Sequence, residues 1–433
     1  MQFSEEQVLA LAPDEASRKS GKELSNPTKW VSKGANRQAL WGECQGSGSK
    51  PYQTQIDLSN IAFKCSCPSR KFPCKHGLGL LLLYARQQQS FTTDELPAWV
   101  QEWISKRAGT AEKKVEPKDK PVDEAAQAKR MQAREQKVSD GIEELLLWIK
   151  DIVRNGILNI PEKSPAFWEN MAKRMVDAQA PGLAGMIREL SNTNFYNEGW
   201  QTKFIDQLVR IYLLIQAYKN SNSLDELLQA DIKSLIGFTQ SVEELKAQSG
   251  VKDDWFVLGK QVTQEDQLMV ERNWLYGIHT KQYALVLQFF VRNQLLTTTL
   301  TPGVTINAEL IFYPSCTPLR ALVKQQFSIK TNIPVDGLAS WNEVAMLETN
   351  YNRYNPFINA YPFVIDALKP VQLNNQWWLK DKENKLMRIE DNFSNIWRLL
   401  AISGGETLQL AVTGKENNYA PIGVWYHATY ILL

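Results

Sequence analysis

The residues best suited to chemistry in this chain lie within a stretch of twelve. It contains three of the five cysteines and one of the three histidines: Cys65, Cys67, Cys74 and His76. Their spacing is Cys-x-Cys, a gap of six residues, and then Cys-x-His. Three thiolates and one imidazole at this density are typical of a tetrahedral Zn²⁺ site. Because four protein donors leave no coordination position open, the spacing favours a structural metal over a catalytic one.

The neighbouring sequence predicts how these four side chains are positioned. Residues 61–67 have the pattern of a strand, on which Cys65 and Cys67 point to the same side. Pro68 ends that strand, and a six-residue loop leads to a leucine-rich helix that runs from His76 to about Gln89. Two alternatives are four unligated side chains, or a disulfide within the Cys-x-Cys pair. The disulfide alternative leaves the matching spacing of Cys74 and His76 without a reason.

These four residues match, one by one, the ligand positions of the SWIM zinc finger, and the stretch resembles the finger of bacterial SWIM-type proteins. The resemblance covers residues 28–90, including a hairpin at 40–58 and the leucine-rich helix. It implies a small zinc-stapled ββα-like module, with Zn²⁺ as cofactor, that contacts DNA or other proteins. It also implies partners, namely a MoxR-type AAA+ ATPase or a von Willebrand A-domain protein, for which this chain would be an adaptor or scaffold.

The composition limits the possible classes of protein. With 433 residues, 43% of them hydrophobic and a net charge of +2, the chain is expected to be globular, multidomain and not a polyanion binder by bulk charge. Five cysteines, three of them in a metal pattern, do not suit a secreted disulfide scaffold, so we expect a cytoplasmic protein. The N-terminus lacks the pattern of a signal peptide. The longest apolar run, residues 77–85, is too short to cross a membrane.

Positive charge is concentrated around the predicted finger. Residues 17–77 contain eleven lysines and arginines against three acidic residues. Four of these cations surround the metal ligands and are candidate nucleic-acid contacts: Lys64, Arg70, Lys71 and Lys75. Cationic side chains neutralise phosphates, and Phe63 or Phe72 would stack on a base. The alternative is that these cations solubilise the module and offset the negative charge of the zinc thiolates.

The periodicity of apolar residues predicts an α+β multidomain chain with a central helical bundle and a mostly β C-terminal domain. We place an N-terminal region with the finger at 1–107, a charged linker running into a helix at 108–140, a helical domain at 141–250 and a strand-rich α+β domain at 251–433. The charged linker is expected to decouple the zinc module, so that the C-terminal domain stays folded when zinc is lost.

The sequence contains no recognisable catalytic motif, such as a phosphate-binding loop, a zinc-protease helix or a nucleophile elbow. His279 and His427 lie at or in predicted strands, where a lone histidine is usually structural. We therefore predict a zinc-binding interaction protein and not an enzyme. The alternative is a DNA- or RNA-binding protein that uses the basic face of the finger.

Overall fold

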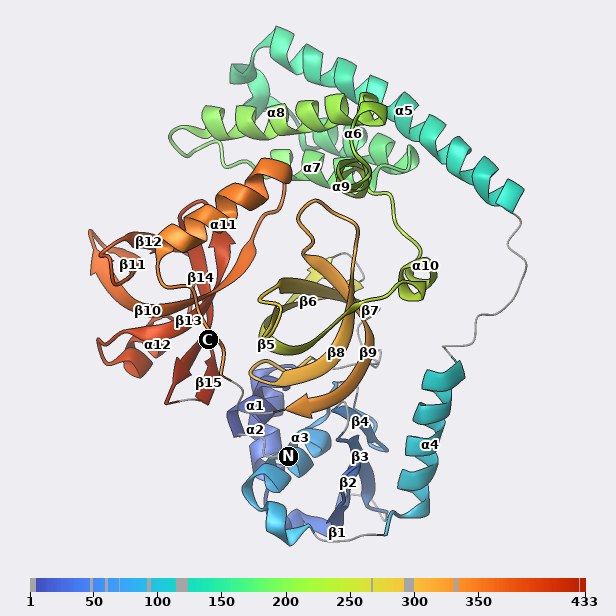
Figure 1. The fold of residues 1–433 in the computed structure, drawn as a ribbon, viewed down its shortest axis with the longest axis vertical. Helices are drawn as coiled ribbons and strands as arrows, with labels where there is room; N and C mark the ends of the chain where they lie inside the picture. Colours follow the sequence, from blue (N-terminus) through green and yellow to red (C-terminus); the bar gives the residue numbers. More distant parts are fainter. Residues whose placement is uncertain are drawn as a thin grey trace.

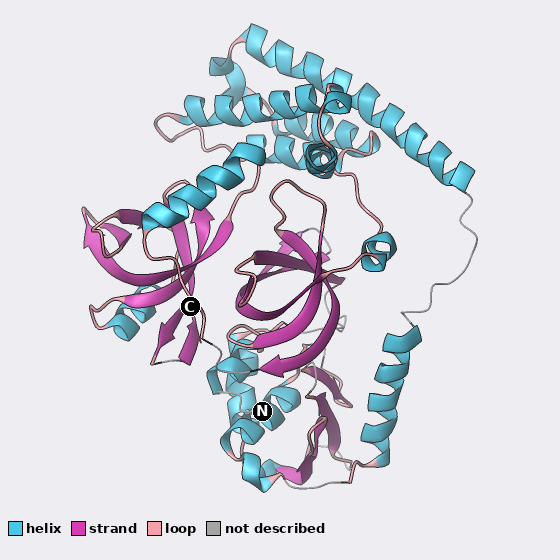
Figure 2. Cartoon of the chain, in the orientation of Figure 1, coloured by secondary structure: helices cyan, strands magenta, loops and turns pink. Residues whose placement is uncertain are grey.

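The computed structural model describes residues 5–46, 50–58, 61–69, 71–91, 95–113, 124–265, 268–291, 300–330, 334–427 and 429–433. A β-barrel lies at the centre of the molecule (Figure 1). The helical bundle lies above the barrel in this view, the C-terminal sheet to its left and the N-terminal module below it. Figure 2 shows that the bundle is helical and that the N-terminal module combines helices with a small sheet, whereas the barrel and the C-terminal unit are built mainly of strands.

The N-terminal module is a four-stranded antiparallel meander between helices. Its helices are α1 (Glu5–Ala10), α2 (Glu15–Leu24), α3 (Lys75–Arg86) and α4 (Ala98–Lys113), with short 3-10 turns η1 (Pro27–Lys29) and η2 (Gln88–Ser90). Its strands are β1 (Trp30–Ala35), β2 (Ala39–Cys44), β3 (Tyr52–Asp57) and β4 (Ala62–Cys65). The bounds of β2 and β3 confirm the hairpin expected at 40–58, whose two strands are joined by a turn rich in glycine and serine.

Helices cover both faces of this sheet. Successive residues of a strand point to opposite sides, so each strand contributes side chains to two cores. On β2, Leu40 and Cys44 face a core shared with α3. Ala39 and Trp41 face a second, smaller core with Val100 and the other apolar residues of α4. The sheet is thus the middle of three layers, and α3 lies on the same face as the metal loop.

The central helices pack around one large core. They are α5 (Glu124–Asn155), α6 (Pro165–Asp177), α7 (Pro181–Ser191), α8 (Trp200–Lys219), α9 (Glu226–Ile236) and α10 (Val242–Ala247), with 3-10 turns η3 (Ile157–Glu162) and η4 (Ser221–Ser223). Prolines begin α6 and α7, where a missing backbone N–H costs nothing. The apolar stripe predicted on α8 is buried at Phe204, Leu208, Ile211 and Ile215 and partly buried at Tyr218. Tyr212, which was predicted in the same stripe, is exposed.

The predicted strand-rich domain at 251–433 contains two separate β units. The first is a closed barrel in the order β5-β6-β7-β9-β8. Its strands are β5 (Val251–Glu265), β6 (Leu268–Gly277), β7 (Tyr283–Val291), β8 (Thr305–Phe312) and β9 (Arg320–Lys330). All pairings are antiparallel except that of β7 with β9. This strand order resembles that of the five-stranded OB-type barrel.

The second β unit is a six-stranded sheet in the order β12-β11-β10-β13-β14-β15. Its strands are β10 (Tyr361–Leu373), β11 (Gln376–Lys380), β12 (Leu386–Ile389), β13 (Leu408–Lys415), β14 (Asn418–Tyr426) and β15 (Thr429–Leu432), with α11 (Trp341–Tyr354) and α12 (Ile396–Ser403) beside it. The predicted helix at 343–361 ends at Tyr354, and the strands β6, β10 and β12 were not predicted. The two longer ones, β6 and β10, mix polar and apolar residues without clean alternation. The third, β12, is only 4 residues long.

The barrel contacts the other three units. The side-chain amide of Gln7 in α1 donates a hydrogen bond to the carbonyl of Gly303 at 3.0 Å, and Val304 is part of the N-terminal core. The backbone N–H of Cys316 donates to the carboxylate of Asp231 in α9 at 2.9 Å. The hydroxyl of Tyr430 in β15 donates to the carbonyl of Leu258 in β5. The expectation that the zinc module is decoupled is therefore wrong, because this module packs against the barrel.

The segment predicted as a charged linker at 108–140 is helical at both of its ends. Helix α4 continues to Lys113 and α5 begins at Glu124, while residues 114–123 lie outside the described part of the chain. Among the helices that the structure describes, none combines the length and apolar character that crossing a bilayer requires.

Candidate metal centre

The four predicted ligands come from two elements that meet at one edge of the N-terminal sheet. Cys65 is the last residue of β4, and Cys67 follows two residues later. Cys74 is the N-cap residue of α3, and His76 lies in its first turn. The pairing of β3 continues past Cys65, because Gln53 and Ser66 are joined by two hydrogen bonds of 2.9 Å. This extension fixes the Cys-x-Cys segment before the chain turns away.

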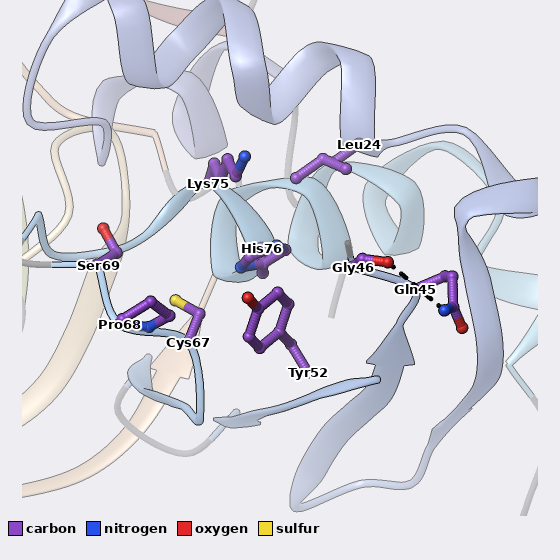
Figure 3. A pocket seen from close by; sticks show the side chains of 9 residues that line it. All are labelled: Leu24, Gln45, Gly46, Tyr52, Cys67, Pro68, Ser69, Lys75 and His76. Carbon is purple, nitrogen blue, oxygen red and sulfur yellow. Dashed lines mark hydrogen bonds between the residues drawn. The ribbon is translucent and has the colours of Figure 1, made fainter. Parts of the chain in front are cut away.

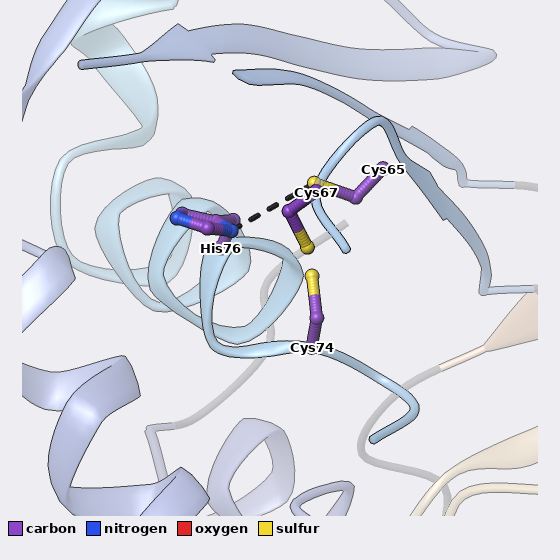
Figure 4. Close-up of side chains that lie close together, drawn as sticks. All are labelled: Cys65, Cys67, Cys74 and His76. Atoms are coloured by element: carbon purple, nitrogen blue, oxygen red, sulfur yellow. Dashed lines mark hydrogen bonds between the residues drawn. The ribbon is translucent and has the colours of Figure 1, made fainter. Parts of the chain in front are cut away.

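The donor atoms of these four residues converge as a zinc ion requires (Figure 4). All four lie within 4.8 Å of one another, and the Sγ of Cys65 lies 3.8 Å from the Nδ1 of His76. A tetrahedron with Zn–S bonds of about 2.3 Å has edges of about 3.8 Å. The residues therefore fit a Zn²⁺ ion with little movement, and zinc is the cofactor that this cluster is built to hold.

Neighbouring residues orient two of the ligands. The Oγ1 of Thr54, which is fully buried, lies 3.2 Å from the Sγ of Cys65 in the paired position on β3. The ring of Tyr52 packs on the ring of His76 with their centroids 4.9 Å apart. Sequence reasoning missed both residues. The signal was available, because Tyr52 and Thr54 share one face of a predicted strand next to the one that ends at Cys65.

The ionisation of the three thiols differs within the cluster. A hydrogen bond from the Cys74 thiol, with further ones from His76 and Thr54, lowers the pKa of Cys65 to about 4 against the opposing effect of burial. The same hydrogen bond, together with burial, raises the pKa of Cys74. Burial raises the pKa of Cys67. Before a metal binds, Cys65 is therefore the thiolate, and binding must displace protons from the other two sulfurs.

Two glycines let α3 approach its neighbours closely. A Cβ at Gly77 would lie 2.8 Å from Cδ1 of Phe63 in β4, and one at Gly79 would lie 2.7 Å from Cβ of Leu24 in α2. At its other end, α3 is held by Arg86, whose guanidinium donates to both carboxylate oxygens of Glu5 at 2.7 and 2.6 Å. The helix that carries two ligands is thus positioned along its whole length.

A hollow of about 500 Å³ adjoins the metal site (Figure 3). It is lined by Leu24, Gln45, Gly46, Tyr52, Cys67, Pro68, Ser69, Lys75 and His76. Of the three cysteine ligands, Cys67 alone lines it, and Cys67 is half-buried. Cys74 is buried, with an exposed fraction of 6%, and does not line the hollow.

The candidate nucleic-acid contacts that the structure describes are not gathered on one face. The Nζ of Lys71 lies 2.7 Å from the carboxylate of Asp14, and this hydrogen bond is the main reason that the pKa of Asp14 is lowered to about 2. Lys64 is an exposed residue of β4. Its neighbour Phe63 faces α3, and successive side chains of a strand point to opposite sides, so Lys64 points to the side of the sheet that α4 covers. Lys75 lies at the rim of the hollow. Arg70 lies outside the described residues.

The comparisons with known proteins match two parts of the chain. A family model described as the SWIM zinc finger matches residues 52–85, which contain all four ligands. A second model, described as a SWIM-associated four-helix bundle domain, matches residues 133–236. That range begins within α5 and ends with α9, and motif reading did not find it. The searches of curated proteins and of solved structures gave no match.

Proposed function

Because this chain is a SWIM zinc finger protein that also carries a SWIM-associated four-helix bundle domain, we propose that it is an interaction protein, an adaptor or scaffold whose zinc ion is structural. The observation that carries this proposal is the closed donor set, in which three sulfurs and one imidazole nitrogen surround a single point. Such a site supplies folding energy and leaves no coordination position for a substrate. We assign the chain no catalytic step.

The distribution of charge supports a protein partner over a nucleic acid. Binding to a phosphate backbone needs several free cations on one surface. Here Lys71 forms an ion pair with Asp14, and Lys64 and Lys75 lie on different faces of the module. The expected basic face of the finger is therefore broken up among the residues that the structure describes.

Within the described residues, part of the surface that OB-type barrels use for oligonucleotides is covered in this barrel. Those barrels bind on the outer face of their second and third strands and on the adjoining loops. In this chain Trp274 and Tyr276 of β6 and Tyr283 of β7 are buried in a core shared with the C-terminal sheet. The loop between β8 and β9 is held to the bundle through the backbone of Cys316. Both regions are thus used in part for contacts within the molecule, while Leu268 of β6 and Phe289 of β7 remain exposed.

An exposed apolar stripe on α8 further supports a protein partner. Ile205, Val209 and Leu213 follow one another at intervals of four residues, with exposed fractions of 44, 44 and 56%. Side chains at this spacing lie along one side of a helix. Contiguous exposed apolar surface of this sort commonly marks a site of protein contact. We propose that the partner contacts the zinc module and this stripe.

The resemblance of the finger suggests a partner of the MoxR-type AAA+ ATPase or von Willebrand A-domain class, acting in the cytoplasm. The test is affinity purification of the full chain from its native host, with and without nuclease. We expect a specific protein to be recovered in both conditions. It should be lost from the double variant Val209→Asp, Leu213→Asp and retained by the control Leu227→Asp, which alters an exposed leucine on α9. Recovery of no specific protein would refute the proposal.

The alternative, binding of DNA or RNA through Lys64, Arg70, Lys71 and Lys75, predicts salt-sensitive binding of oligonucleotides. Fluorescence anisotropy with single- and double-stranded probes measures it directly. We expect weak binding that the double variant Arg70→Ala, Lys71→Ala leaves unchanged. Tight binding that this double variant abolishes would establish the alternative in place of our proposal.

A further inference from the structure

The three sulfurs of the metal centre differ in how easily a small molecule can reach them. The hollow beside the site is bordered by Cys67, Ser69 and Lys75 on one side (Figure 3). Cys65 is half-buried like Cys67, but it does not line the hollow, and its sulfur lies 3.2 Å from Oγ1 of the buried Thr54. Cys74 is buried at the helix N-cap and does not line the hollow either. An oxidant that enters through the hollow therefore meets the sulfur of Cys67 first.

A second sulfur is in position to react with the first. The sulfurs of Cys67 and Cys74 point toward one another (Figure 4), and all donor atoms lie within 4.8 Å. In the zinc-loaded protein all three ligand cysteines are thiolates, because zinc displaces their protons. Thiolates that are solvent-accessible and lie next to a second cysteine are the ones that oxidants convert to disulfides. Cys44 does not meet these conditions, because it is fully buried in the core of the module.

We propose that Cys67 is an oxidation site, at which a hydroperoxide attacks first and Cys74 then closes a disulfide, so that the metal centre is dismantled by oxidation. The proposal concerns regulation and does not depend on which partner the protein binds. It assigns different roles to cysteines that the ligand motif treats as equivalent.

The chemistry balances with hydrogen peroxide as the oxidant. The Cys67 thiolate attacks one peroxide oxygen, so that an S–O bond forms, the O–O bond breaks and the departing hydroxide takes a proton from solvent to become water. The sulfur of Cys74 then attacks the sulfenic sulfur of Cys67, which forms the S–S bond and releases a second water after protonation. Two thiolates lose two electrons in total and one peroxide gains them. With two of four donors in a disulfide, the site no longer holds the ion.

The test is zinc release from the full-length zinc-loaded protein treated with hydrogen peroxide, followed with a chromogenic chelator and by peptide mapping of the thiols. We expect zinc release to accompany a Cys67–Cys74 disulfide, with sulfenic acid trapped by dimedone first at Cys67. A Cys65–Cys67 disulfide, first trapping at another cysteine, or zinc release without thiol oxidation would overturn the proposal.

A variant that keeps every ligand makes the test independent of folding. Ser69→Trp places a large side chain at the mouth of the hollow and should slow zinc release by about threefold or more, since reactivity follows access. The control Val31→Trp alters an exposed residue on β1 that does not line the hollow, and Cys44→Ser removes a buried thiol. Both controls should release zinc at the wild-type rate. An unchanged rate in Ser69→Trp would contradict access through the hollow.

Discussion

At the scale of single residues, the metal centre shows how much of a ligand's behaviour is set by its neighbours. Cys65, Cys67 and Cys74 have the same chemistry in the unfolded chain. In the fold, Cys65 receives hydrogen bonds that favour its thiolate, whereas burial favours the protonated form of Cys67. Thr54 and Tyr52, which contact the ligands Cys65 and His76, are therefore part of the site.

Zinc affinity should fall steeply as pH falls from 7 to 5. The pKa of Cys65 is about 4, so this residue is a thiolate throughout that window. The pKa values of Cys67 and Cys74 are raised, so both sulfurs carry protons that zinc must displace. Because zinc displaces two protons, the apparent affinity for zinc falls by about 100-fold for each pH unit of acidification. A competition titration with a chelator of known pH dependence measures this slope, and an affinity independent of pH would contradict the assignment.

Thr54→Val should weaken zinc binding by about tenfold, because it removes the hydroxyl next to the Cys65 sulfur while keeping the shape of a fully buried side chain. The measurement is the zinc dissociation constant at neutral pH. Thr28→Val is the control, since Thr28 is exposed and bonds only to Asn26 within the residues that the structure describes. Equal affinities in the two variants would show that the Thr54 hydroxyl plays no part in orienting Cys65.

At the scale of secondary-structure elements, α3 connects the metal site to the rest of the N-terminal module. Its N-cap and its first turn each carry one ligand, its middle is buried and its last residue, Arg86, is paired with Glu5 of α1. Glycine is a poor helix former, so Gly77 and Gly79 reduce the intrinsic stability of this helix. What they allow is contact with β4 and α2 at distances that any Cβ would prevent.

Gly79→Ala should therefore destabilise the protein even though alanine favours the helix by about 1 kcal/mol. The new Cβ would lie 2.7 Å from Cβ of Leu24 and 3.0 Å from its carbonyl carbon. Overpacking of this kind costs about 1–3 kcal/mol. Gly185→Ala in α7 is the matched control, because a Cβ at that position would meet no neighbouring atom within 4 Å and the helix gain should appear alone. Thermal unfolding of both variants measures the difference, which should have opposite signs.

The features of the fold that could be predicted are those determined by residues close together in the sequence. The ligand spacing and the strands around the Gly- and Ser-rich turn depend on neighbouring residues, and the structure confirms them. The pairing of Lys71 with Asp14, which weakens the case for nucleic acid, joins residues far apart in the sequence. Strand β6 was missed because its buried residues include Glu271 and Asn273, which a search for alternating apolar residues excludes.

At the scale of the whole molecule, the barrel links the other units. Its contacts with the zinc module, the bundle and the C-terminal sheet use different surfaces. Asp231 of α9 accepts hydrogen bonds both from the backbone of Cys316 in the barrel and, at 3.3 Å, from the side chain of Asn355 before the C-terminal sheet. One buried carboxylate thus joins three units.

Removing zinc should loosen part of the barrel as well as the finger. The path runs from the ligands through α3 and Arg86 to α1, and from Gln7 to Gly303 and Val304. Hydrogen–deuterium exchange with and without a chelator should show faster exchange at residues 75–86 and 300–306. Residues 165–215 in the bundle are the internal control and should exchange at unchanged rates. Protection at 300–306 that does not respond to zinc would show that the two units fold independently.

The packing of Val304 and Ile329 against the core of the N-terminal module has a consequence for biosynthesis. The ribosome completes the first hundred residues long before it adds the two side chains that finish their core. At about 5–20 residues per second, roughly 200 further residues take about 10–40 s. During that interval the nascent finger has an incomplete apolar surface, so zinc acquired early would hold it together until the barrel emerges.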